Sequence, residues 1–178
     1  MADFFGNPAA PTFATPLEML RACHGRILDQ CKTLNKLMHH IPAHGCDIQA
    51  QQAANSIMRY FDTAAQFHHQ DEETDLFPLL LAANNAEVEA LIRRLLGEHQ
   101  EMGAAWQSLR RRLQEIADGK NVALEEKVVA DFSAAYQKHI DLENTQLLPL
   151  SARLLSIPQL DELGHKMAAR RGVTLAPS

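Results

Sequence analysis

Cysteine, basic charge and long apolar runs are all scarce in this sequence. The three cysteines, Cys23, Cys31 and Cys46, form no Cys-x2-Cys spacing, so we expect free thiols rather than a disulfide framework or a thiolate metal site. No apolar stretch approaches the ~20 residues that cross a bilayer, and the N-terminus lacks the basic start of a secretory signal. The net charge of -5 gives no reason to expect nucleic acid. We therefore expect a cytoplasmic protein without membrane or nucleic-acid partners; nothing identifies a protein partner.

The composition that is present fits a single folded domain. The chain has 178 residues, of which 46% are hydrophobic and 22% charged, and this is enough to bury a sizeable core. Residues 1–15 carry prolines without any period, and we expect a loose N-terminal arm there. We expect the main domain over residues 16–155 and a short helix with a tail over residues 156–178.

Apolar residues recur every three or four positions through most of the chain, which is typical of amphipathic helices. The first predicted helix opens with Thr15 as N-cap and Pro16 at its first position. Pro78 and Pro149 should kink the second and fourth helices, because proline removes a backbone donor. The first predicted long helix runs from Pro16 to near Pro42–Gly45, and the second from about Asp47 to the low eighties. The third follows Asn84-Asn85 and is closed by Asp118-Gly119, and the fourth starts near Val122 and carries Leu150. This pattern predicts an all-α fold, namely an up-down-up-down four-helix bundle with a fifth short helix outside it.

One chemical phrase occurs twice. The first repeat, His68–Leu79, reads His-x3-Glu-x-Thr-x-Leu-Phe-Pro-Leu, and the second repeat, His139–Leu150, reads His-x3-Glu-x-Thr-x-Leu-Leu-Pro-Leu. A histidine and a glutamate four residues apart project from one face of a helix. Each repeat therefore offers one imidazole and one carboxylate to the same region of space.

Polar side chains occupy helix positions where the period would otherwise place Leu or Ile. Burying an unpaired carboxylate or imidazole costs several kcal/mol, so these groups need one another or a cation as partners. With a rise of ~1.5 Å per residue, their depths along the bundle make a single shared layer feasible. A metal-free polar core is the alternative. The predicted metal ligands are His24, His68, Glu72, His99, His139 and Glu143.

These residues resemble the hemerythrin-like His-His-Glu cation-binding family over about residues 16–155. The likeness rests on the first repeat with its His68-His69 pair, on Glu98-His99, and on the second repeat. It implies a non-haem di-iron centre in which Glu72 and Glu143 bridge the two irons. The terminal ligands would be His24, His68, His99 and His139. Imidazole with carboxylate suits iron, manganese or zinc, so the choice of iron rests on the resemblance.

One position departs from the oxygen-carrying members of that family. They place a second histidine one turn after the third helix's ligand, where this chain has Gly103. The six-ligand set is more similar to di-iron proteins that repair iron–sulfur clusters, although their N-terminal cysteine-containing domain has no counterpart here. His69 lies about 100° from the His68 face, so we expect it beside the site rather than as a ligand.

The ligand count predicts what the site can do. Six ligands with an oxo or hydroxo bridge leave roughly two open positions on two octahedral irons. We expect dioxygen, nitric oxide or peroxide to bind there, in a sensor, store or scavenger. The alternatives are redox activity in iron–sulfur cluster repair or in detoxification of peroxide or nitric oxide, and a metal pair that only stiffens the bundle.

Overall fold

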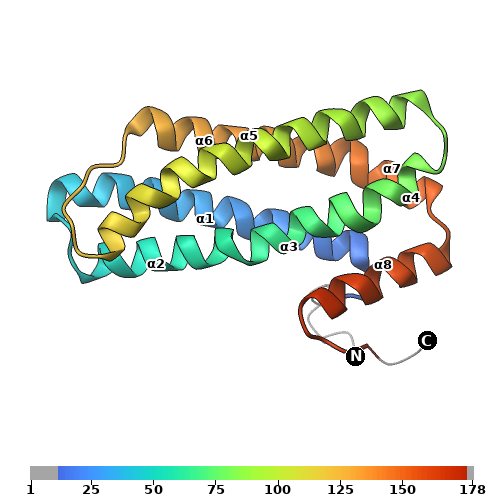
Figure 1. Cartoon of the computed structure of the whole chain (residues 1–178), viewed down its shortest axis with the longest axis horizontal. Coiled ribbons are helices and arrows are strands. Elements are labelled where there is room, and N and C mark those ends of the chain that lie inside the picture. Colours follow the sequence, from blue (N-terminus) through green and yellow to red (C-terminus); the bar gives the residue numbers. More distant parts are fainter. Residues whose placement is uncertain (1–11, 176–178) are drawn as a thin grey trace, which may run out of the picture.

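The computed structural model describes residues 12–175, and within that range the only regular secondary structure is helical. Helix α1 (Pro16–His44) packs against α2 (Ile48–Asp62) and α6 (Glu126–Leu142), and α5 (Ala86–Ala117) packs against the same two helices. Figure 1 shows these helices lying side by side along the long axis. The α1–α2 and α5–α6 connections lie at one end, and the α4–α5 connection lies at the other. The all-helical prediction is confirmed.

Two of the predicted long helices have the expected boundaries. Helix α1 begins at Pro16 and ends before Gly45, which adopts a left-handed φ of 72°. Thr15 stands at the N-cap position, but its side chain makes no capping hydrogen bond. At α5 the side chain of Asn85 caps the helix by accepting hydrogen bonds from two backbone N–H groups of the first turn.

The start of the fourth long helix was predicted too early. Helix α6 begins at Glu126 rather than near Val122, because residues 120–125 form an irregular connection. Leu124 is buried within that connection. An apolar residue buried in a loop imitates the periodic pattern of a helix, and the sequence pattern alone does not separate the two cases.

The segment predicted as one helix from residue 47 consists of several pieces. After α2 the chain breaks at Thr63 and continues as α3 (Ala64–Gln70), the π-helical segment η1 (Asp71–Leu76) and α4 (Phe77–Leu81). The second repeat has the same design. Helix α6 leads into the π-helical segment η2 (Glu143–Leu147) and then into α7 (Leu148–Leu154).

The two prolines account for these π turns. The N–H of Phe77 bonds to the carbonyl of Glu72, and the N–H of Leu148 bonds to the carbonyl of Glu143, in each case five residues back. The next residue is Pro78 or Pro149, which has no N–H and would clash in an ordinary α-helical turn. Each repeat therefore widens into a π turn where a kink was expected.

The predicted short helix at the C-terminal side is α8 (Ile157–Arg170), which begins with a capping box between Ser156 and Gln159. It lies beside the four long helices, as Figure 1 shows, but it is packed against α1 and η1 and buries Leu163 and Met167. It is therefore more closely attached than expected. The predicted arm falls largely on residues 1–11, outside the described range.

Two apolar clusters lie one above the other along the bundle. On α1, Leu20 belongs to one cluster and Ile27 to the other, and His24 lies between them. His99 occupies the same place on α5. The polar layer is therefore enclosed by apolar packing above and below. Across residues 12–175, none of the helices is long and apolar enough to span a membrane.

Candidate metal centre

The residues singled out by the sequence lie together in the middle of the bundle. Their ligand atoms form two groups whose members lie within 4.8 Å of one another, and the two glutamates belong to both groups. All of these side chains are buried. One group is His24, His68, Glu72 and Glu143; the other is Glu72, His99, His139 and Glu143.

Each glutamate faces both groups with a different oxygen. In Glu72, Oε1 lies 3.4 Å from Nε2 of His68 and Oε2 lies 3.4 Å from Nε2 of His99. In Glu143, Oε2 lies 3.1 Å from Nε2 of His24 and Oε1 lies 3.1 Å from Nε2 of His139. A carboxylate that points one oxygen at each of two histidine groups has the arrangement of a bridging ligand. The arrangement therefore offers two neighbouring cation positions with two shared carboxylates.

The histidines of the second group are held with their Nε2 atoms toward each other. Nδ1 of His99 lies 2.6 Å from Glu73 Oε1, and Nδ1 of His139 lies 2.8 Å from Glu98 Oε2. A carboxylate accepts, so each Nδ1 donates, and a neutral imidazole then presents a lone pair at Nε2. The two Nε2 atoms are 3.1 Å apart. Two nitrogens bound at right angles to one metal at ~2.1 Å have a separation of about 3 Å, so this spacing fits a shared cation.

The histidines of the first group are held differently. Nδ1 of His24 lies 2.8 Å from the amide oxygen of Asn144, so Nδ1 donates and Nε2 faces Glu143 as a lone pair. Neither ring nitrogen of His68 has a hydrogen-bond partner. Histidines that bind metals usually donate their second nitrogen to a neighbouring group, which fixes the ring. This holds for His24, His99 and His139 here.

Buried polar atoms without partners are concentrated at this site. Apart from Gln30 Oε1, all such side-chain atoms found in residues 12–175 lie in or beside the cluster. Each unpaired buried group costs roughly 1–3 kcal/mol. They are His24 Nε2, His68 Nδ1 and Nε2, His69 Nε2 and both carboxylate oxygens of Glu72 and Glu143. Lone pairs that converge without donors fit a cation, so this donor set suits the metal that the sequence suggests.

In the metal-free protein, protons bound by the site residues compensate part of the buried negative charge. Burial and the neighbouring Glu143 carboxylate raise the pKa of Glu72 well above its usual value. Burial opposes ionisation of Glu143 too, but the neighbouring imidazoles of His139 and His24 outweigh it and hold the pKa of Glu143 well below the usual range. The nearby Glu143 carboxylate outweighs burial at His139 and raises the pKa of that imidazole. The two glutamates therefore differ in protonation although their positions in the repeats are equivalent.

Sequence reasoning did not identify the residues that hold the histidines. They are Glu73, Glu98 and Asn144. Each lies one residue from a predicted ligand, on a face that periodicity assigns to the surface. The repeats contained a signal, because Glu73 and Asn144 each directly follow the glutamate of a repeat and each reach to a different helix.

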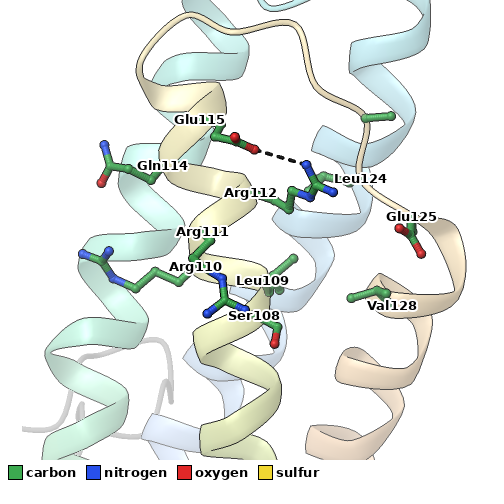
Figure 2. Close-up of a pocket in the computed structure, with 11 residues that line it drawn as sticks. Ser108, Leu109, Arg110, Arg111, Arg112, Gln114, Glu115, Leu124, Glu125 and Val128 are labelled. Carbon is green, nitrogen blue, oxygen red and sulfur yellow. Dashed lines mark hydrogen bonds and ion pairs between the residues drawn. The ribbon is translucent and has the colours of Figure 1, made fainter.

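A separate pocket lies away from this cluster. It has a volume of about 610 Å³ and lies between the end of α5 and the start of α6, lined in part by Arg110, Arg112 and Val128. Figure 2 shows these side chains around the connection, with Arg112 paired to Glu115. None of the lining residues belongs to the histidine–glutamate cluster. The pocket does not contribute to the candidate centre.

Fold and site together define a helical protein with a buried imidazole–carboxylate site for cations. The chain belongs to the hemerythrin HHE cation-binding domain family, which it matches over residues 15–151. It is also similar to a Haemophilus influenzae protein, itself described as an uncharacterized protein. That protein is 32% identical over 162 residues, which cover 91% of this chain and 93% of that protein.

Proposed function

We propose that this protein holds two non-haem iron ions in an up-down-up-down four-helix bundle and binds dioxygen, nitric oxide or peroxide at them. The observation that carries the proposal is the pair of glutamates, each of which points one oxygen at each histidine group. In this assignment Glu72 and Glu143 bridge the ions. His24 and His68 bind one ion, and His99 and His139 bind the other.

The chemistry of the donor set supports this assignment. Imidazole and carboxylate ligands suit iron, manganese and zinc, and the family likeness favours iron. Four imidazoles and two bridging carboxylates supply about eight of the roughly twelve bonds that two octahedral irons accept. A bound iron pair supplies redox chemistry and open positions for a small ligand. The chain's own residues hold the site dry, because apolar clusters lie above and below it.

Metal analysis of the purified protein tests the ligand set. We expect about two irons per chain in the wild type and loss of most of the iron in His68→Ala and Glu143→Ala. His39→Ala is the matched control, because His39 is an exposed histidine of α1 and should leave the iron content unchanged. Retention of iron by both site variants, or preferential loading with manganese or zinc, contradicts the proposal.

The biological role within this proposal is a sensor, store or scavenger. Redox turnover, in iron–sulfur cluster repair or in removal of peroxide or nitric oxide, is the second candidate, because a ligand set with open positions also permits it. Stopped-flow mixing of the iron-loaded protein with peroxide separates the two. One stoichiometric spectral change indicates binding, and repeated turnover indicates catalysis. The cytoplasmic location expected from the sequence stays a prediction.

A further inference from the structure

The end of helix α8 is attached to the π segment η1 by a network of ion pairs. Nη2 of Arg170 lies 2.5 Å from Oδ2 of Asp75, and Arg170 also pairs with Asp71. Nη2 of Arg171 lies 2.7 Å from the second carboxylate oxygen of Asp71. Both aspartates are buried, and both arginines are largely covered. Charged groups held out of water therefore join α8 to η1.

Further contacts give Arg171 and α8 a defined position. The Arg171 guanidinium lies 5.6 Å from the centre of the Phe13 ring and 5.7 Å from that of Phe67, close enough for a cation to be attracted to each ring. Arg171 also donates a hydrogen bond to the carbonyl of Met167 within α8. Gly164 of α8 faces the backbone of Phe13 so closely that a Cβ atom would clash there. The orientation of α8 is therefore fixed by close packing as well as by charge.

The segment that α8 contacts is the one that carries Glu72. Asp71 directly precedes Glu72 in η1, and neighbouring residues of a helix project in different directions. Asp71 faces α8, whereas Glu72 faces the histidines of the bundle. A functional side chain must be held within about 0.5 Å of its working position by the residues that support it. A rotation of η1 that released Asp71 from α8 would also change the direction of Glu72.

The second repeat has no equivalent of these ion pairs. Asp71 corresponds to Leu142, which is buried in an apolar cluster, and Asp75 corresponds to Gln146, which is exposed. Helix α8 packs against α1 and η1. The backbone around Glu143 is therefore held by apolar packing, whereas the backbone around Glu72 depends on a helix that follows the four long ones.

We propose that Arg170 and Arg171 are positioning residues for Glu72, and that docking of α8 and binding of cations stabilise each other. The proposal deepens the proposed function and rests on it. With α8 docked, η1 is held so that each carboxylate oxygen of Glu72 faces one histidine group. Bound cations in turn hold Glu72 and η1, which keeps the two aspartates in place for the arginines. Coupling of two equilibria is reciprocal, so both effects have the same size.

Hydrogen exchange of the wild type tests this coupling without any substitution. Helix α8 carries none of the predicted metal ligands. At short exchange times, before the amides of α5 exchange, the amides of α8 report local opening of that helix. We expect iron(II) to slow their exchange about tenfold, because bound metal favours the docked position of η1. An uncoupled α8 would open at the same rate with and without iron(II).

A double variant measures the reciprocal effect. In Arg170→Gln with Arg171→Gln, we expect about tenfold weaker iron(II) binding in competition with a chelator, and the exchange of α8 should no longer respond to iron(II). The matched control is Arg93→Gln with Arg153→Gln, which removes the same charge from exposed positions and should bind iron(II) like the wild type. Circular dichroism checks that both proteins keep their helices.

The outcomes separate this inference from the proposed function. If iron(II) binds but does not change the exchange of α8 in the wild type, the proposal is wrong, and this result does not depend on folding of a variant. It is also wrong if the folded double variant binds iron(II) as tightly as the control, because α8 then only covers the bundle. If the wild type takes up no iron(II), the proposed function fails, and the positioning role fails with it.

Discussion

The two repeats have the same backbone but different surroundings. In both, the His-x3-Glu pair leads into a π turn, and a proline follows as the second residue of the next helix. In both, the residue after the glutamate reaches to a histidine of another helix. In the first repeat that residue is Glu73, and in the second it is Asn144. Equivalent positions therefore carry a charge in one repeat and a neutral amide in the other.

The difference extends to the rest of the segment. His69 in the first repeat corresponds to Ile140 in the second, so only one repeat brings an extra imidazole. Asp71 in the first repeat corresponds to Leu142, and Asp71 is buried against the arginines at the end of α8. The comparison teaches that a near-symmetric scaffold places Glu72 and Glu143 alike, whereas the residues around them give the two glutamates different surroundings.

The largest difference between the repeats should appear in stability. Asp71→Ala removes the buried carboxylate partner of Arg171 and leaves Arg170 with Asp75 alone. Burial outweighs the two arginines and raises the pKa of Asp71, so desolvation offsets part of the pairing energy. We expect a loss of about 2–3 kcal/mol in the free energy of unfolding of the metal-free protein, measured with urea. Gln146→Ala, a substitution at an exposed position of the second repeat, should change the free energy of unfolding little. Equal losses in the two variants would contradict the expected difference in stability between the repeats.

The next difference should appear in metal affinity. Glu73→Ala removes a charged acceptor from His99, and we expect about 10–100-fold weaker iron binding in competition with a chelator. Asn144→Ala removes a neutral acceptor from His24 and should weaken binding less, because charge-assisted hydrogen bonds are roughly twice as strong. Equal losses of iron affinity in the Asn144 and Glu73 variants would contradict this ranking.

The two glutamates should also titrate differently in the metal-free protein. Because the folded-state pKa of Glu72 is raised, its contribution to stability is present below the ordinary glutamate pKa of about 4.3 and is lost as pH rises through the raised value. Glu143 has a lowered pKa and contributes above about 4.3, and this is lost on acidification. Unfolding measured across pH should show that Glu72→Gln removes the decline toward higher pH. Glu143→Gln should instead remove the loss at acid pH, and identical profiles for the two variants would contradict the assignment.

The smallest effect tests the likeness of the repeats. Pro78 and Pro149 are both exposed and both follow a π turn. Replacing either with alanine gives the unfolded chain more freedom, so we expect each to lose about 0.4–1 kcal/mol of unfolding free energy. Thermal unfolding of both variants checks this. Clearly different losses would show that the shared sequence does not have the same structural role in both places.

The sequence predicted the parts of this molecule that depend on helical periodicity. Spacing alone marked His24 and His99 as polar residues in apolar seams, and the structure brings them to the predicted layer. Their role as ligands stays a prediction. The early start assigned to the fourth helix failed because Leu124 is buried from a loop, which the same periodicity does not distinguish from a helix.

The features that the sequence did not predict depend on contacts between helices. Glu73 and Glu98 lie off the seams, and they become informative only when neighbouring helices place a histidine within reach. The stacking of His69 on His99 likewise depends on how α3 faces α5. Pro78 and Pro149 did predict an irregularity in each helix, but the sequence alone does not show whether the helix bends or forms a π turn.

A π turn can be described as an α-helical turn with one residue inserted. The two π segments are therefore positions where evolution or protein engineering can change the length of the helix. Each additional residue rotates everything beyond it by about 100° relative to the preceding part of the helix. The predicted ligands His68 and His139 lie before the insertions, while Leu80 of the terminal apolar cluster lies after one. Single-residue insertions and deletions at these two turns would therefore reorient the glutamates against an unchanged distal core, and length variation there is a route to a different metal site in the same bundle.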